Sequence, residues 1–102
     1  MHTITLQNRP RIVSGAAIAG KKEGEGPRHA DFDQIIEDDL FGEETWEMAE
    51  SRLQSTAGTL AIRKAGLTPD QIGVALGGDL LNQIMAAALS ARELGIPFLG
   101  LY

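Results

Sequence analysis

The chain has 102 residues, of which 43% are hydrophobic, and this length and composition suit one soluble globular domain. Nine Lys and Arg residues against fourteen Asp and Glu residues give a net charge of -5, which argues against nucleic acid or an anionic membrane as a partner recognised by charge. The chain has no cysteine, which excludes disulfides, thiolate metal sites and a thiol nucleophile within these residues, and no apolar run reaches the roughly 18 residues of a membrane-spanning helix.

Two strands are predicted near the amino terminus. Residues 1–10 alternate apolar and polar side chains and predict an edge strand that Pro10 interrupts. Residues 11–19, RIVSGAAIA, predict a first buried strand whose small side chains permit a neighbour to approach closely.

Residues 20–32 are rich in glycine and charge and predict a loop. A phosphate-binding loop needs the sequence Gly-Lys-Ser or Gly-Lys-Thr at the start of a helix. Here Lys21 is followed by Lys22 and Glu23, so nucleotide binding is not expected.

Acidic side chains are concentrated in residues 31–50, which carry nine of the fourteen acidic residues and no basic one. Such a block most often forms a solvated surface, and the alternatives are a cation site or a contact for a partner protein. The spacing of an EF-hand loop, with its glycine and closing glutamate, is absent, so no metal site is assigned.

A helical turn and then a long helix are predicted next. Residues 31–41 predict a short turn with its apolar side chains on one side, closed by Gly42. A long helix is predicted from about residues 43–45 to Ala65, because apolar residues recur there at helical spacing and the charges at both ends suit the helix dipole. Gly66 suits the left-handed position just past a helix end, and Gly58 indicates a close contact inside the helix.

The last third of the chain is predicted as a strand, a helix and a strand, which form a crossover unit of a parallel sheet. A capping-box pattern with proline at the first helical position predicts one turn at residues 68–71. Strands are predicted over residues 72–76 and 98–102, and a helix over residues 80–94 that Gly95 ends.

The two faces of this predicted helix differ in side-chain size. A bulky apolar stripe is expected to face the core and comprises Leu80, Leu81, Ile84, Met85, Ala88 and Leu89. The other face is small and polar and comprises Asn82, Ala86, Ser90 and Glu93. The alanine run at residues 86–88 predicts close packing against another helix or a subunit.

Asp79 is the candidate functional residue. It follows the carboxyl end of a predicted parallel strand, which is where ligands bind in open α/β folds. One interpretation is a helix cap for the amides of Leu81 and Asn82, a role worth on the order of 1 kcal/mol. The other interpretation is a neighbour of a bound ligand. The two roles can coexist, since one carboxylate oxygen can cap while the other faces a pocket.

Four segments carry a resemblance that spans essentially the whole chain: GAAIAGKKEGEGP, DFDQIIEDDLFGEETWEMAESRLQ, KAGLTPDQIGVALGGDLLNQ and ARELGIPFLGLY. In these segments the chain resembles the start of the stage V sporulation protein AD family, which occurs in spore-forming bacteria and belongs to the thiolase and ketoacyl-synthase superfamily. The most specific parts are GDLLNQ at residues 78–83, GIPFLGLY at residues 95–102 and the KKEGEGP loop. The resemblance implies an α/β fold in which residues 1–102 form the amino-terminal fragment of a thiolase-like domain, with a mixed or mainly parallel sheet, covering helices and an end after a central strand.

The resemblance also implies a function. It implies a non-enzymatic, thiolase-like protein that binds dipicolinic acid, with or without calcium, and helps to move it into the developing spore. It places Asp79, Asn82 and Gln83 beside the ligand, where the aspartate would act through calcium, water or a ring-nitrogen proton. The implied partners are other stage V sporulation A membrane proteins and a second copy in a homodimer, at the cytoplasmic face of the forespore or spore inner membrane.

The alternative function is a thiolase or 3-ketoacyl-synthase-type acyltransferase that acts on coenzyme A thioesters. In related enzymes a nucleophilic cysteine follows directly after the strand that matches residues 98–102, and His and Asn residues lie in the second half of the protein. The 102 residues contain no such cysteine. No catalytic residue and no cofactor are therefore assigned.

Overall fold

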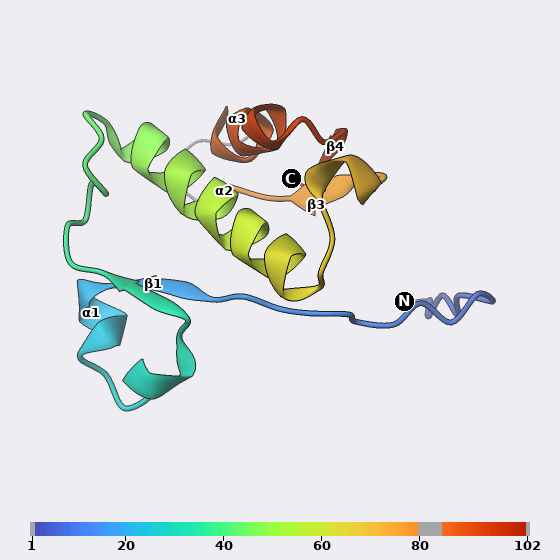
Figure 1. The fold of residues 1–102 in the computed structure, drawn as a ribbon, viewed down its shortest axis with the longest axis horizontal. Helices are drawn as coiled ribbons and strands as arrows, with labels where there is room; N and C mark the ends of the chain where they lie inside the picture. Colours follow the sequence, from blue (N-terminus) through green and yellow to red (C-terminus); the bar gives the residue numbers. More distant parts are fainter. Residues whose placement is uncertain (1, 80–84, 102) are drawn as a thin grey trace.

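The computed structural model describes residues 2–79 and 85–101. Seven helices and strands follow one another in this part: β1 (Ile18–Gly20), α1 (Lys21–Gly24), β2 (Gln34–Ile36), α2 (Trp46–Lys64), β3 (Ala75–Gly77), α3 (Met85–Leu94) and β4 (Phe98–Gly100). Two 3₁₀ turns join them, η1 (His29–Asp31) and η2 (Pro69–Gln71). Figure 1 shows α2 across the middle of the molecule, between α3, β3 and β4 on one side and α1, β1 and β2 on the other.

The strands form two parallel pairs. β1 pairs with β2 with Ala19 opposite Ile35, and β3 pairs with β4 with Leu76 opposite Leu99. α1 and η1 lie in the connection of the first pair, and α3 lies in the connection of the second. Parallel strands need such a crossover because the end of the first strand and the start of the second lie at opposite edges of the sheet. The predicted α/β class with parallel strands is therefore confirmed.

Local sequence signals set both ends of α2. The hydroxyl of Thr45 accepts a hydrogen bond of 3.2 Å from an amide in the first turn. At the other end, Gly66 has a φ of 73° and its amide donates to the carbonyl of Arg63 at 2.9 Å. The amide of Leu67 donates to the carbonyl of Ile62 at 3.1 Å, which completes a Schellman motif. The predicted start, end and closing glycine of this helix are confirmed.

Helix α3 packs its small face, and not its bulky face, against α2. Ala86 is 0% exposed and Ala91 is 3% exposed, whereas Met85 is 47% exposed. The expectation that Met85 lies in the core is therefore wrong, because α2 approaches α3 too closely for large side chains. The close packing predicted from the alanine run is confirmed. Gly95, with a φ of 71°, ends α3 as predicted, while the predicted start at Leu80 lies outside the described residues.

The β3–β4 pair has two different faces in the part of the chain that the structure describes. Leu76 and Leu99 lie opposite each other on the outer face and are 60% and 57% exposed. A Cβ added at Gly77 would lie on the opposite, inner face, 3.2 Å from the Phe98 ring and 3.4 Å from the Cβ of Ala87. The end of β3 therefore approaches α3 closely at Gly77.

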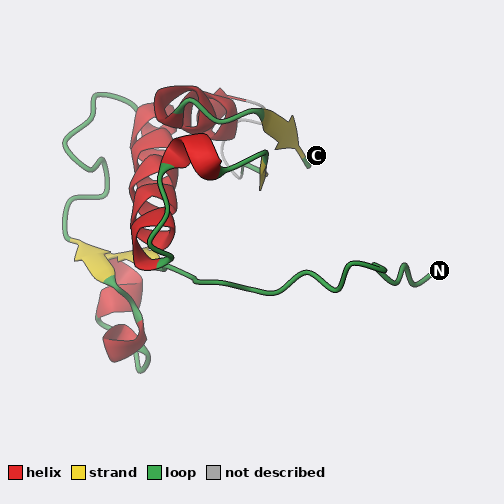
Figure 2. Cartoon of the chain, turned by 45° about the vertical axis from the view of Figure 1, so that its right-hand side comes forward, coloured by secondary structure: helices red, strands yellow, loops and turns green. Residues whose placement is uncertain are grey.

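The amino-terminal segment differs from its prediction. Residues 2–10 form no strand, and Ile4 is 83% exposed. The strand predicted over residues 11–19 is confined to Ile18–Gly20, and Ile12 is 96% exposed. A strand needs a neighbour for its backbone hydrogen bonds, and residues 2–17 have no strand beside them in the described part. Figure 2 shows the amino-terminal part of this segment extending away from the helices, whereas the hydroxyl of Ser14 donates to the carbonyl of Ala61 in α2 at 2.6 Å.

Two further predictions in residues 20–41 are wrong. The predicted loop contains α1 and η1, and the predicted helical turn contains β2. The β-branched Ile35 and Ile36 favour a strand once β1 supplies a pairing edge, although their spacing also fits a helical turn. Gly24 lets α1 lie against β2, because a Cβ at this position would be 2.5 Å from the side chain of Ile35.

The lobe formed by β1, α1, η1 and β2 is attached to the carboxyl end of α2 by polar contacts. Lys64 Nζ donates to Asp33 Oδ1 at 2.5 Å and to the carbonyl of Gly15 at 3.0 Å. Asp33 Oδ2 accepts from the amide of Ala17 at 2.7 Å. The hydrogen bond from Lys64, followed by that from Ala17, lowers the pKa of Asp33 below its ordinary value of 3.8.

This attachment predicts a pH-dependent stability. Because the pKa of Asp33 is lowered in the folded chain, its contribution is fully present above the unfolded value of 3.8 and is lost as the pH falls through the lower folded value. We expect Asp33→Asn to lower the thermal midpoint at pH 7, with a difference from wild type that shrinks as the pH falls below 3.8. Thermal denaturation of both chains from pH 7 to pH 2.5 measures this. A pH-independent difference would contradict the ion pair as its cause.

Candidate functional site

Asp79 joins three elements at the end of β3. It lies two residues after the strand, and its Oδ1 accepts a hydrogen bond from Gln54 Nε2 of α2 at 3.2 Å. The same oxygen accepts a hydrogen bond of 2.8 Å from the amide of Ala87 in α3. A single carboxylate oxygen thus connects the strand end to both long helices.

The contact with Ala87 makes Asp79 a cap of α3. Amides in the first turn of a helix have no partner within the helix, and Ala87 is the third residue of α3 as described. The predicted cap contacts, with the amides of Leu81 and Asn82, lie outside the described residues, as does Gln83. The described cap bond therefore spans eight residues, which is longer than the local capping pattern on which the prediction rested.

The second carboxylate oxygen of Asp79 has no partner in the described part of the chain. Asp79 Oδ2 is buried and accepts no hydrogen bond there. A buried acceptor without a donor costs about 1–3 kcal/mol, and more where the group is charged. The geometry therefore leaves one anionic oxygen placed to accept a bond from a water molecule, a ligand donor or a cation.

A cavity of about 170 Å³ adjoins Asp79 on the inner face of the β3–β4 pair. Both hydrogen-bond partners of Asp79 line it, and most of its other lining groups are apolar or small: Gln54, Gly58, Ala75, Leu76, Gly77, Ala87, Ser90, Ala91, Leu94 and Phe98. Gly58, where the sequence indicated a close contact, would place a Cβ 3.2 Å from the side chain of Leu94. The cavity is thus small and largely apolar, and two of its lining residues, Gln54 and Ala87, are hydrogen-bonded to Asp79.

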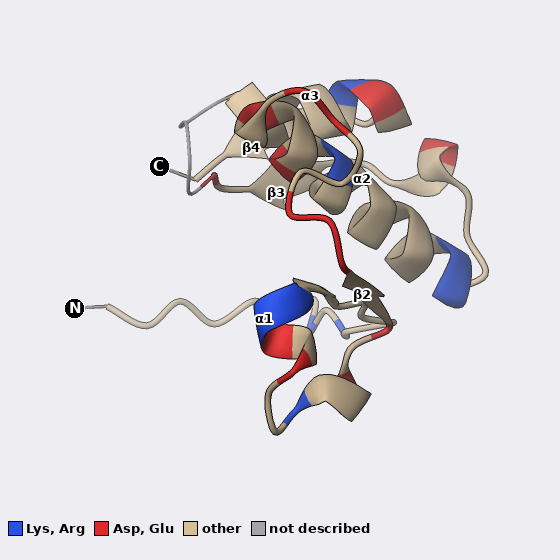
Figure 3. Ribbon diagram, turned by 90° about the vertical axis from the view of Figure 1, so that its left-hand side faces the viewer, with Lys and Arg blue, Asp and Glu red and all other residues tan. Residues whose placement is uncertain are grey.

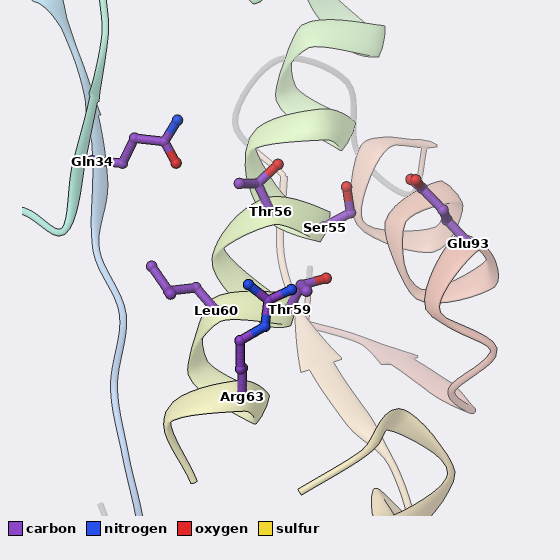
Figure 4. Close-up of a pocket in the computed structure, with 7 residues that line it drawn as sticks. All are labelled: Gln34, Ser55, Thr56, Thr59, Leu60, Arg63 and Glu93. Carbon is purple, nitrogen blue, oxygen red and sulfur yellow. The ribbon is translucent and has the colours of Figure 1, made fainter. Parts of the chain in front are cut away.

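A second and more polar cleft, of about 280 Å³, lies along α2 between β2 and α3. Figure 4 shows its lining groups, which come from α2, α3 and β2: Gln34, Ser55, Thr56, Thr59, Leu60, Arg63 and Glu93. Sequence reasoning missed this cleft. The only signal was the helical spacing of Thr56, Thr59 and Arg63, which is also typical of a solvated helix face.

The acidic block of residues 31–50 is largely a solvated surface, as predicted. Six of its nine acidic side chains are exposed: Asp31, Asp33, Glu37, Asp38, Asp39 and Glu44. Figure 3 shows acidic positions along the connection from β2 to α2. Within residues 2–79 and 85–101, no three His, Cys, Asp or Glu side chains converge as a metal site would require.

Part of the acidic block forms an ordered loop against α2. The two carboxylate oxygens of Asp38 accept hydrogen bonds from the amides of Leu40 and Gly42, at 3.1 and 2.8 Å. The guanidinium of Arg52 donates to the carbonyl of Phe41 at 2.8 Å and lies 4.4 Å from the centre of its ring. Asp38 therefore has a structural role that does not need a cation.

No helix in the described part of the chain is both long and apolar enough to cross a membrane.

The strands form parallel pairs, and an aspartate lies just past the end of β3. These features define an α/β protein of the class in which ligands bind at strand ends.

Comparison with known proteins then identifies the family. The family model for Stage V sporulation protein AD (SpoVAD) matches residues 1–102. Over 91 residues the chain is 42% identical to Stage V sporulation protein AD of Bacillus subtilis (strain 168), an alignment that covers 89% of this chain and 27% of that relative. The chain therefore belongs to the Stage V sporulation protein AD family, which confirms the resemblance drawn from its sequence. It spans about a quarter of the length of this relative, as the 27% coverage shows.

Proposed function

We propose that the chain forms part of a dipicolinic acid site, and that the protein takes part in the uptake of dipicolinate into the developing spore. Family membership supports the sporulation role. The observation that carries the proposed binding role is the buried Oδ2 of Asp79, which has no partner among residues 2–79 and 85–101, together with the 170 Å³ cavity that the two residues bonded to Asp79 line. An unpaired buried oxygen at a strand end is a position that a ligand can satisfy.

The chemistry of dipicolinate limits how Asp79 can contact it. The ligand is a flat pyridine ring with two carboxylates, and a direct approach of these carboxylates to Asp79 would be repulsive. Asp79 Oδ2 would instead accept from a protonated ring nitrogen or a bridging water, or would share a calcium ion with the ligand. The apolar cavity wall suits the ring. Asn82 and Gln83 are proposed to supply amide donors to the carboxylates.

The proposal includes the setting of this site. The fold would be thiolase-like and non-enzymatic, and the protein would lie peripherally on the cytoplasmic face of the forespore or spore inner membrane. Its partners would be the other stage V sporulation A membrane proteins, with a homodimer as the working unit. Transfer of an acyl group from a coenzyme A thioester by the Bacillus subtilis relative would contradict the non-enzymatic part.

Isothermal titration with dipicolinate tests the binding role. We expect binding by the Bacillus subtilis relative and by the present chain, measured with and without calcium, and a loss of about tenfold in affinity, or roughly 1.4 kcal/mol, on Asp79→Asn. Asp39→Asn is the matched control, because Asp39 is an exposed aspartate outside the cavity, and it should leave the affinity unchanged. Unchanged affinity for Asp79→Asn would remove Asp79 from the site, and no binding by either protein would contradict the proposed function.

A further inference from the structure

Three polar side chains of α2 follow one face of the helix into the 280 Å³ cleft. Thr56, Thr59 and Arg63 are spaced by three and then four residues, which places them on successive turns of the same face. Glu93 of α3 and Gln34 of β2 line the cleft on either side of this face (Figure 4). The cleft therefore brings one guanidinium, one carboxylate, two hydroxyls and one amide together from three elements.

The side chains of these five residues have no hydrogen-bond or ion-pair partner among the described residues. Three other cations in the same part of the chain are paired, Arg28 with Asp31, Arg52 with Glu43 and Lys64 with Asp33, whereas Arg9, Arg11, Lys21, Lys22 and Arg92 have no ion pair there. Ser55 is the one polar lining residue with an internal bond, from its hydroxyl to the carbonyl of Arg52 at 3.2 Å. The cleft thus holds donors and acceptors that no other described residue uses, and of these Gln34, Arg63 and Glu93 are exposed.

The charges in the cleft select one kind of ligand. A planar guanidinium such as that of Arg63 binds a carboxylate with two parallel hydrogen bonds. A purely anionic ligand would be repelled by Glu93, whereas a ligand with both a carboxylate and an ammonium group can satisfy both residues. The volume of about 280 Å³ lies just below the range of drug-sized sites, which suits a molecule of amino-acid size.

We propose that this cleft is a second ligand site, which binds a small zwitterion of the amino-acid class. Arg63 would receive the carboxylate, Glu93 would receive the ammonium group, and the hydroxyls of Thr56 and Thr59 would add hydrogen bonds. The site is separate from the Asp79 cavity, because the two share no lining residue. It therefore does not depend on the proposed binding of dipicolinate.

Titration of the ¹⁵N-labelled 102-residue chain with glycine, followed by NMR, tests this site. Glycine is expected to shift the amide signals of residues that line the cleft. Succinate, which carries only negative charge, and methylamine, which carries only positive charge, should bind at least about tenfold more weakly. Arg63→Gln and Glu93→Gln should each weaken glycine binding by about tenfold or more. Arg92→Gln is the matched control, since Arg92 is exposed, lies next to Glu93 and does not line the cleft.

Several results would overturn the proposal. Glycine that shifts no cleft signal in a chain with a well-dispersed spectrum removes the site. Succinate that binds as tightly as glycine contradicts the zwitterion assignment. Glycine affinity that is equal in wild type and Arg63→Gln removes the proposed charge partner. Dipicolinate binding by the same chain is a separate measurement, so failure of one site leaves the other testable.

Discussion

Replacing Ala86 with Leu is expected to destabilise the chain by about 1–3 kcal/mol. Ala86 is 0% exposed in α3, which packs against α2, and the buried residues of α2, which include Ser51 and Ser55, are also small. Three added carbon atoms have no space there unless the helices move apart. Since 1 kcal/mol shifts the melting temperature of a chain of this size by about 4–8 °C, thermal denaturation should show a fall of roughly 10 °C.

The neighbouring residue provides the control for this experiment. Met85→Leu changes a side chain that is 47% exposed on the same helix, so its effect on stability should be within about 0.5 kcal/mol. If Ala86→Leu melted at the same temperature as Met85→Leu, the two helices would not be in the close contact that the burial of Ala86 indicates.

The helix ends could be predicted from the sequence because the groups that fix them are close in the chain. Thr45 bonds an amide three residues later, and Gly66 and Gly95 take the left-handed conformation directly past their helices. Such interactions need no partner from elsewhere in the fold. The same is true of the turn at Pro69–Gln71, where the side chain of Gln71 accepts a bond of 2.9 Å from the amide of Thr68.

The strand pairing could not be predicted in the same way, because a strand depends on a partner that is distant in the sequence. Ile35 forms a strand because Ala19 lies opposite it, whereas Ile4 and Ile12 have no such partner in the described part and are exposed. The buried face of α3 was missed for a related reason. Hydrophobic spacing favours the large side chains as core, but the approach of α2 decides which face fits.

The candidate site was predicted in part. The position of Asp79 after a strand was enough to single it out, but its partner Gln54 is 25 residues away on another helix. The polar cleft gave no separate signal, since Thr56, Thr59, Arg63 and Glu93 are residue types common on solvated helix faces. Only the packing of α2 and α3 brings these side chains to one cleft (Figure 4).

Replacing Asp79 with Ala is expected to destabilise the chain by about 1–3 kcal/mol. The change removes two hydrogen bonds to a charged acceptor, from Gln54 Nε2 and from the amide of Ala87, each worth about 1.5–3 kcal/mol. It also removes the buried Oδ2, which has no partner among the described residues and costs about 1–3 kcal/mol, so part of the loss is offset. Chemical denaturation of the ligand-free chain measures the net effect, and equal stability of Asp79→Ala and wild type would contradict the capping role.

Asp79→Asn separates the structural role of this residue from its proposed role in binding. The asparagine keeps one side-chain oxygen, which can accept from the amide of Ala87, and Asn is as good a cap as Asp. Its stability should therefore lie closer to wild type than that of Asp79→Ala, while its dipicolinate affinity falls. Loss of stability equal to that of Asp79→Ala would show that the negative charge itself holds the strand end to the helices, because only the charge and one oxygen differ. Wild-type stability with weakened binding would assign Oδ1 to the fold and Oδ2 to the ligand.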